Sequence, residues 1–335
     1  MKKVATKILS ALLLFSVTAS CVTLLSSCSE RQNEFSFYGL DTLIELKLSS
    51  IGKKEDEEIR NTVESEVGRY EKIFSRTDED AELYKINHSD KTTFTVSDDL
   101  ADLLLRAIGI SQSTDGAFDF TCGSLTELWK ISDSDAPIPG AEEVAEAMKH
   151  VGYDKVSLDG NTLVRPCGLV IDLGAIAKGY IEGKITDLLI SKGVERGILS
   201  FGGNISVFGE KRDKSEYRIA IRNPYGESGH IGYVTTLKGY VSVCGTYERN
   251  KIVDGVFYHH IFDPKNGYPK DTDVISVALI CDDGALADAL STALFVMGDG
   301  AQEWILSCGY DIGAVFFAKD KTVRTMGNVN YISDR

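Results

Sequence analysis

The sequence predicts an α+β fold, in which helices and largely antiparallel strands are mixed. Apolar residues recur every three or four positions in some segments and at alternate positions in others. The two kinds of segment do not follow the βαβ rhythm of a parallel sheet. The 335 residues are 43% hydrophobic and 26% charged, which is ordinary globular composition and excludes collagen, coiled coil and long disorder.

In the first half of the chain the predicted elements are mostly helices. Alternation predicts a strand over 42–48, and apolar residues from Ile59 to Phe74 predict a helix over about 54–74. Ser97, followed by two aspartates, is typical of the N-cap of a second helix. Residues 131–140 are polar and contain two prolines, so we expect a loop there, with a short helix around Val144 and Met148 after it.

Short strands dominate the second half. A strand is predicted to end at Ile171, and a helix follows over about 175–191, closed by Gly193. Further strands are expected at 196–201, 204–208, 216–222, 231–237, 240–244, 274–281, 312–318 and 322–326. Two more helices are expected over about 284–297 and 300–307.

The N-terminus is typical of a targeting segment that lies outside the fold. Three lysines precede an apolar run over 8–17, which is too short for a comfortable membrane span. The run leads to Leu25-Ser26-Ser27-Cys28, which resembles a bacterial lipobox. We therefore expect a signal peptide over 1–27, a lipidated Cys28, a tether over 28–36 and a folded domain over 37–330. An ordinary secretory signal with a chance cysteine is the alternative, and Cys21 is a poorer match.

Lipidation would place the protein on the extracytoplasmic face of a bacterial membrane, because its acyl chains, palmitate among them, give stable anchoring. The net charge is −14, and cleavage before Cys28 removes three lysines and lowers it to −17. A chain this acidic repels a phosphate backbone, so no nucleic-acid partner is expected. An anionic ligand would need a cation to offset the field.

Five patches carry residue types that suit chemistry, and each has a plain structural alternative. Asp115-Gly116-Ala117-Phe118-Asp119 places two acids beside an aromatic, or is simply a capped turn. Asp172 through Lys178 joins a strand end to a helix start, where free N–H groups and a lysine favour phosphate oxygens, although the lysine could equally be solvated. Phe201-Gly202-Gly203-Asn204 allows close approach of a ligand, or is a hairpin turn.

The other two patches hold a histidine pair and a hydroxyl–carboxylate pair. His259 and His260 stand beside Asp263-Pro264, so either a catalytic or a structural histidine fits. Asp288 and Thr292 are four residues apart and share a helix face, which suits a hard cation such as Mg²⁺. The alternative is an exposed aspartate with a threonine bonded back to its own helix.

Taken in order, these patches resemble the ApbE family of FAD:protein FMN transferases. The strings that match run from about Phe37 to Gly298: LDT at 40–42, Ser75-Arg76 through Asn87, DGAFDFT at 115–121, DLGAIAKGY at 172–180, FGGNI at 201–205, CGTYER at 244–249, HHIFDPKNGYP at 259–269 and ADALSTALFVMG at 287–298. The resemblance implies an α+β fold that binds FAD and Mg²⁺ and transfers FMN to a Thr or Ser hydroxyl of a target flavoprotein, with release of AMP.

The resemblance also implies roles for individual residues. His260 would be the catalytic histidine, acting as general base. Mg²⁺ would be held by the Ala175 carbonyl, Asp288 and Thr292. Contacts to FAD would come from Leu40, Ala117, Phe118, Asp119, Asp172, Lys178 and Ile261.

The chain departs from the family pattern at a few positions. Cys244-Gly245-Thr246-Tyr247 stands where the family commonly has Ser-Gly-Asp-Tyr, and Gly183 stands where many members have Asp. The lost aspartate puts a supporting role of that side chain in doubt. Two other functions remain open: a Mg²⁺-dependent FAD pyrophosphatase giving FMN and AMP, and a flavin-binding lipoprotein without turnover.

Overall fold

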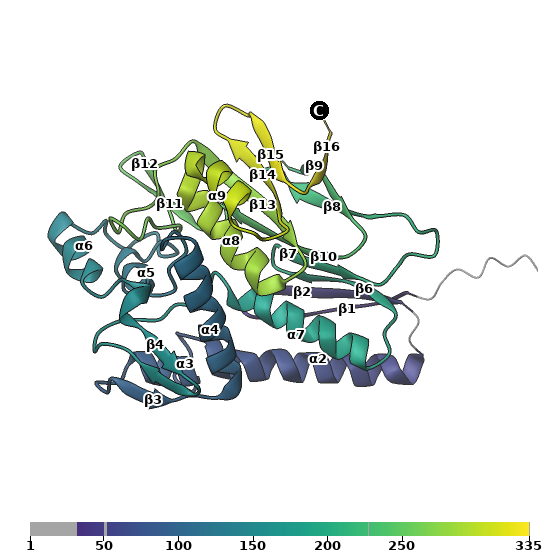
Figure 1. Cartoon of the computed structure of the whole chain (residues 1–335), viewed down its shortest axis with the longest axis horizontal. Coiled ribbons are helices and arrows are strands. Elements are labelled where there is room, and N and C mark those ends of the chain that lie inside the picture. The colour runs from purple at the N-terminus through teal and green to yellow at the C-terminus, as the bar shows by residue number, and fades with distance from the viewer. Residues whose placement is uncertain (1–31, 50–51, 227, 335) are drawn as a thin grey trace, which may run out of the picture.

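The computed structural model describes residues 32–49, 52–226 and 228–334, and its central element is an antiparallel sheet of eight strands. Figure 1 shows this sheet running across the molecule, with helices on one side. In spatial order its strands are β1 (Gln32–Gly39), β2 (Thr42–Ser49), β6 (Arg196–Phe201), β7 (Asn204–Phe208), β10 (Gly239–Gly245), β13 (Val274–Cys281), β14 (Gly313–Ala318) and β15 (Val323–Gly327).

Three long helices cover one face of this sheet: α2 (Lys53–Phe74), α7 (Ala177–Ser191) and α8 (Gly284–Met297). A fourth, α4 (Asp98–Ser113), packs on α8. The main hydrophobic core lies between them and the sheet, because Leu46, Leu199 and Leu279 of the strands are fully buried there. This layer fixes where α7 and α8 meet.

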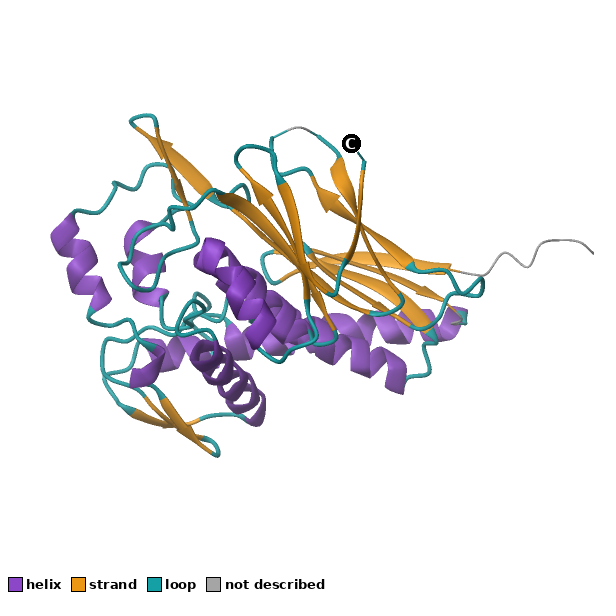
Figure 2. Ribbon diagram, turned by 45° about the horizontal axis from the view of Figure 1, so that its top comes forward, coloured by secondary structure: helices purple, strands orange, loops and turns teal. Residues whose placement is uncertain are grey.

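A smaller sheet covers the opposite face, so the body has three layers (Figure 2). Its order is β16 (Asn330–Ser333), β9 (His230–Thr236) and β8 (Tyr217–Arg222). Val241 and Phe317 of the large sheet pack against Ile219 and Val234 of the small one. The strands therefore send apolar residues to this second core, while β7 and β10 send Asn204 and Ser242 toward the helices.

Most of the remaining elements form a lobe at one end of the body (Figure 1). It contains α3 (Glu82–Asn87), α5 (Gly123–Trp129), α6 (Ala141–Met148) and a three-stranded sheet of β3 (Thr93–Thr95), β5 (Thr162–Val164) and β4 (Ser157–Asp159). A separate hairpin, β11 (Asn250–Val253) with β12 (Val256–His259), meets this lobe, since the rings of Tyr258 and Trp129 lie 5.7 Å apart. The short helix α9 (Ala301–Ser307) precedes β14.

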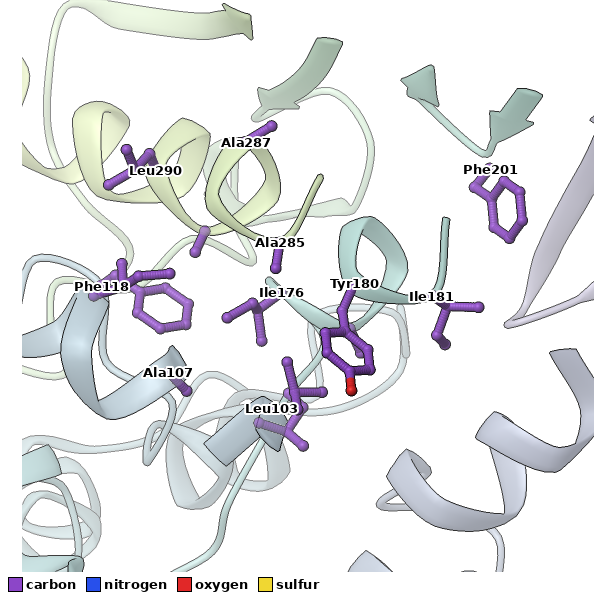
Figure 3. Packing of buried hydrophobic residues seen from close by; sticks show 14 of the residues in the cluster. Leu103, Ala107, Phe118, Ile176, Tyr180, Ile181, Phe201, Ala285, Ala287 and Leu290 are labelled. Atoms are coloured by element: carbon purple, nitrogen blue, oxygen red, sulfur yellow. The ribbon is translucent and has the colours of Figure 1, made fainter. Parts of the chain in front are cut away.

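The core where the lobe joins the body is shown in Figure 3. Leu103 and Ala107 of α4 face Ile176 and Tyr180 at the start of α7, and Ala285 and Leu290 of α8 close the group. Phe118 lies at the edge of this cluster and is 2% exposed. The loop that carries Phe118 is thus fixed by core packing.

The α+β prediction is confirmed, and the predicted helices over 54–74, 175–191 and 284–297 each agree with the structure within about two residues. Two expectations are wrong. Residues 32–36 of the expected tether belong to β1, where Phe35 is buried and Asn33 pairs with Leu48. The residues directly before Ile171, from 165 to 170, form no strand, because both backbone groups of Ile171 bond to the side-chain amide of Asn87 instead of to a neighbouring strand.

Within the described residues, no helix is long and apolar enough to cross a membrane. The predicted signal peptide and Cys28 lie outside the described residues.

Candidate active site

A cavity between α7, α8, the large sheet and the lobe gathers residues from all five patches. The site residues predicted from the sequence that line it are Ala117, Phe118, Asp119, Asp172, Ala175, Lys178, His260, Ile261, Asp288 and Thr292. Leu40 does not line it, but its turn lies next to one lining residue: a Cβ on Gly202 would approach Thr42 Oγ1 to 2.1 Å. The five patches, which are separate in the sequence, therefore meet at one cavity.

Asp288 reaches the start of α7 because two glycines let α7 and α8 touch. A Cβ on Gly179 would lie 2.0 Å from the Gly284 carbonyl oxygen, and a Cβ on Gly284 would lie 2.3 Å from the Gly179 oxygen. At this distance the Gly179 N–H donates to Asp288 Oδ2 at 3.0 Å. The carboxylate, 5% exposed, is thus held at the positive end of the α7 dipole.

The Ala175 carbonyl has no backbone donor. Ala175 lies just before Ile176, the N-cap of α7, so its oxygen is outside the hydrogen bonds of the helix. The N–H four residues on, that of Gly179, donates to Asp288, and the structure records no donor for the Ala175 oxygen among the described residues. Ala175 lines the cavity, so this carbonyl is available to a cation.

Oxygen atoms of three different kinds, from Ala175, Asp288 and Thr292, therefore line the cavity where Mg²⁺ is expected. Asp288 Oδ1 has Ser242 Oγ as a neighbour only at 3.4 Å, and Thr292 Oγ1 donates to Cys244 Sγ at 3.7 Å, so both keep lone pairs for a ligand. No cluster of three or more His, Cys, Asp or Glu that could hold a metal occurs among the described residues. One carboxylate with neutral oxygens suits Mg²⁺, which keeps waters and takes phosphate oxygens as further ligands.

Asp172 holds the turn that presents Ala175. Its Oδ1 accepts from the Gly174 N–H at 2.9 Å, and its Oδ2 accepts from Arg76 Nε at 3.1 Å and from Thr126 Oγ1 at 3.0 Å. Both oxygens are engaged, so Asp172 positions the turn that leads into α7 as well as lining the cavity.

The hydrogen bonds of the two histidines give them different roles. His259 is buried, its Nε2 faces the Lys270 carbonyl at 3.1 Å, and its Nδ1 accepts from the Ile261 N–H at 3.2 Å. Both ring nitrogens are thus used in holding the loop. In His260 it is Nδ1 that faces a carbonyl, that of Arg249, at 3.1 Å.

A carbonyl only accepts, so Nδ1 of His260 carries the proton and Nε2 keeps its lone pair. The structure records no partner for Nε2 among the described residues, and His260 lines the cavity. The Arg249 carbonyl also accepts the backbone N–H of His260, at 3.3 Å, so the base of the β11–β12 hairpin sets the ring. Burial, and then the charge of Arg249, lower the pKa of His260 to about 4.

Two acidic side chains in the cavity wall are pushed toward their neutral forms. Burial raises the pKa of Asp119, although Asp119 accepts from Thr121 and from the Tyr153 N–H at 3.0 Å. Burial also raises the pKa of Glu248, against the opposing effect of Lys178. The wall is therefore less negative than the composition suggests.

Sequence reasoning missed several residues of the site. Glu248 and Arg249 lie in the quoted string CGTYER and Asn204 lies in FGGNI, but no role was given to them. Arg76 was quoted only as part of a matching string. Ser242 gave no signal, because its contact with Asn204 depends on the pairing of β10 with β7.

Comparison with known proteins identifies relatives over most of the chain. The model of the ApbE family matches residues 40–316. An FAD:protein FMN transferase of Klebsiella pneumoniae is 32% identical over 273 residues, which cover 80% of this chain and 84% of that protein. An FAD:protein FMN transferase of Treponema pallidum is 31% identical over 277 residues, which cover 77% of this chain and 76% of that protein.

Solved structures give the same result. The ApbE protein of Thermotoga maritima has a TM-score of 0.81 at 32% identity, with 88% of this chain and 97% of that one covered. The flavin transferase ApbE of Vibrio cholerae has a TM-score of 0.78 at 27% identity, covering 88% of this chain and 96% of its own.

Proposed function

The chain belongs to the ApbE family, and from this premise we propose that it transfers FMN from FAD to a hydroxyl of a target flavoprotein. The observation that supports this best is that one cavity is lined both by oxygen atoms that can bind a cation and by a nitrogen that can accept a proton. Oxygen ligands for a cation come from Ala175, Asp288 and Thr292, and a histidine nitrogen with a free lone pair comes from His260. Phosphoryl transfer from a pyrophosphate to a hydroxyl needs both.

The residues present fit Mg²⁺, because the Ala175 carbonyl lacks a backbone donor and Asp288 supplies a single formal charge. Mg²⁺ bound there would neutralise the pyrophosphate and stabilise charge on the AMP side. Lys178, in the first turn of α7, offers a further positive charge to the phosphates. The N-terminal end of α7 adds its dipole in the same direction.

His260 handles the proton of the acceptor. The hydroxyl oxygen of a Thr or Ser forms a bond to the phosphorus of the FMN half, and the bond from that phosphorus to the bridging oxygen breaks, so AMP leaves. The hydroxyl proton passes to Nε2, which is the unprotonated nitrogen. The low pKa keeps His260 neutral at ordinary pH, and the arrival of an anionic pyrophosphate raises the pKa toward a more basic value.

We also propose that Cys28 is lipidated and anchors the protein to the extracytoplasmic face of the membrane. The support is the lipobox-like string at 25–28. β1 begins at Gln32, four residues after Cys28. At roughly 3.5 Å per residue, the anchor lies at most about 14 Å from the start of the sheet. The edge of the large sheet would then stand close to the lipid surface.

Incubation of the protein with FAD, Mg²⁺ and a candidate flavoprotein tests the function. We expect flavin fluorescence to stay with the acceptor in a denaturing gel, and AMP to appear in equal amount. FMN and AMP released without any labelled acceptor would support the pyrophosphatase alternative instead. FAD bound without either product would support a flavin-binding lipoprotein.

A further inference from the structure

The cavity wall contains a buried amide that uses only half of its hydrogen-bonding capacity. Asn204, at the start of β7, is 3% exposed and lines the cavity. Its Oδ1 accepts from Ser242 Oγ at 2.8 Å, but its Nδ2 has no partner among the described residues. A buried donor without a partner is costly, and such groups are rare in native proteins.

The orientation of this amide follows from Ser242. Ser242 has one proton, and its oxygen neighbours are Asn204 Oδ1 at 2.8 Å, Asp288 Oδ1 at 3.4 Å and Ser291 Oγ at 3.4 Å. The Ser291 hydroxyl donates its own proton to the backbone carbonyl oxygen of Asp288, at 2.8 Å. If the amide nitrogen faced Ser242, the Ser242 proton would have only oxygen neighbours at 3.4 Å, which is too long for a good O–H···O bond. The amide oxygen of Asn204 therefore faces Ser242, and its N–H₂ group remains without a partner among the described residues.

The unused donor lies close to the cation ligands. A single serine hydroxyl links Asn204 to the carboxylate of Asp288. An N–H₂ group cannot bind a cation, so its partner is an acceptor, and in this part of the cavity the acceptors to be bound are phosphate oxygens. The turn that precedes it, Gly202-Gly203, has φ of 60° and 113°, a backbone conformation that favours glycine, so neither turn residue carries a Cβ beside Asn204.

We propose that Asn204 is an FAD-binding residue whose Nδ2 donates to a pyrophosphate oxygen, while its Oδ1 ties it through Ser242 to the carboxylate of Asp288. This rests on the proposed function, because it assumes a diphosphate ligand. A neutral donor has a particular value here: it binds an anion without competing with the cation for Asp288.

The test is FAD binding without turnover, measured by flavin fluorescence in EDTA and again in Mg²⁺. Asn204→Asp keeps the shape and replaces the donor with a charged acceptor. We expect it to weaken FAD binding by about tenfold or more, since a hydrogen bond to a charged group becomes a repulsion. Asn204→Ala should weaken binding less, because it removes the donor without adding a negative charge.

Asn33→Asp is the matched control. Asn33 lies in β1, is 6% exposed and also has an unpartnered Nδ2, but it does not line the cavity. Asn33→Asp should lower stability and leave FAD binding unchanged. Wild-type FAD binding by both Asn204 variants would overturn the proposal, and so would tighter Mg²⁺ binding by Asn204→Asp, which would mean that the amide oxygen faces the cavity.

ADP serves as a second probe that separates this proposal from the proposed function. It carries a diphosphate but no flavin. Loss of ADP binding in Asn204→Asp, together with a wild-type protein that transfers no FMN, would refute the transferase function and keep the diphosphate contact. FMN transfer by the wild-type protein, with unchanged ADP and FAD affinity in Asn204→Asp, would support the transferase function and refute the contact of Asn204 with the diphosphate. Failure of the wild-type protein to bind FAD and ADP would overturn the proposal outright.

Discussion

The contact between α7 and α8 can be tested with a pair of glycine substitutions on one helix. Gly179→Ala would place a Cβ 2.0 Å from the Gly284 carbonyl oxygen and 2.8 Å from Asp288 Cβ. Backbone cannot move aside as a side-chain end can, so the helices must separate. Gly183→Ala, one turn further along α7, meets nothing nearer than Tyr240 Oη at 3.8 Å, which is ordinary contact.

The two substitutions should therefore change stability in opposite directions. Alanine gains about 1 kcal/mol over glycine inside a helix, so Gly183→Ala should be neutral or stabilising by up to that amount. Overpacking costs about 1–3 kcal/mol, so Gly179→Ala should be destabilising by an amount in that range even after the helix gain, because the clash is with backbone. Separation of the helices also lengthens the bond from the Gly179 N–H to Asp288 and so moves the carboxylate away from the start of α7.

Urea unfolding measures the first effect, and FMN transfer against Mg²⁺ concentration measures the second. We expect Gly179→Ala to need more Mg²⁺ for half-maximal activity, and Gly183→Ala to match the wild-type protein. Equal stability of the two variants would refute the close helix contact. Equal Mg²⁺ dependence, with Gly179→Ala destabilised, would refute the claim that this contact positions Asp288 for the cation.

Four further predictions follow from the site. His260→Ala should lower FMN transfer by roughly 10²–10⁴-fold with little change in FAD binding, while His259→Ala should mainly lower the unfolding temperature; an equal catalytic loss in both would place the base elsewhere. Asp288→Asn should lose activity and regain part of it at high Mg²⁺, and Thr292→Ala should be milder because water can replace a neutral ligand; activity that persists in excess EDTA would contradict the metal site. Only neutral His260 can accept a proton, and kcat/KM reports the free enzyme, so kcat/KM should stay level down to about pH 5 and fall near the pKa of about 4. The acid-side fall of kcat should lie at a higher pH than that of kcat/KM, because a bound pyrophosphate raises the pKa of His260. A fall of kcat/KM centred near the ordinary pKa of 6.5 would contradict the burial argument. Cys28→Ala should move the protein from the membrane fraction to the soluble fraction, which a blot of the two fractions measures.

The sequence predicted those parts of the site in which a local pattern carries the chemistry. Asp288 and Thr292 share a helix face by spacing alone, and the Gly174-Ala175 turn leads directly into α7. Residue types alone did not separate His259 from His260, and only the family resemblance singled out His260, because their partners are backbone carbonyls of Lys270 and Arg249, eleven residues away in each case. Local residue types carry no information about such bonds.

Two strand pairs were shortened or missed because their residue patterns are unusual for strands. β1 was assigned in part to the tether because its first residues are polar, and only pairing with β2 makes it a strand. The hairpin β11–β12 was missed because it exposes Ile252 and Phe257 on one face and buries the charged Lys251 on the other. That lysine donates to two carbonyls of the lobe, including that of Trp129 at 2.9 Å, an arrangement that inverts the usual hydrophobic pattern.

The acidic charge of the chain raises the question of how it holds an anionic substrate, and the site gives a local answer. The charge of Asp172 is offset by Arg76 at 3.1 Å, and that of Asp288 by the N-terminal end of α7. Burial raises the pKa of Asp119 and of Glu248, which favours their uncharged forms. Each of the four carboxyl groups of the cavity wall is thus paired, capped or pushed toward neutrality. These local contacts offset part of the negative charge at the cavity, and a bound cation would add the positive charge that a pyrophosphate needs.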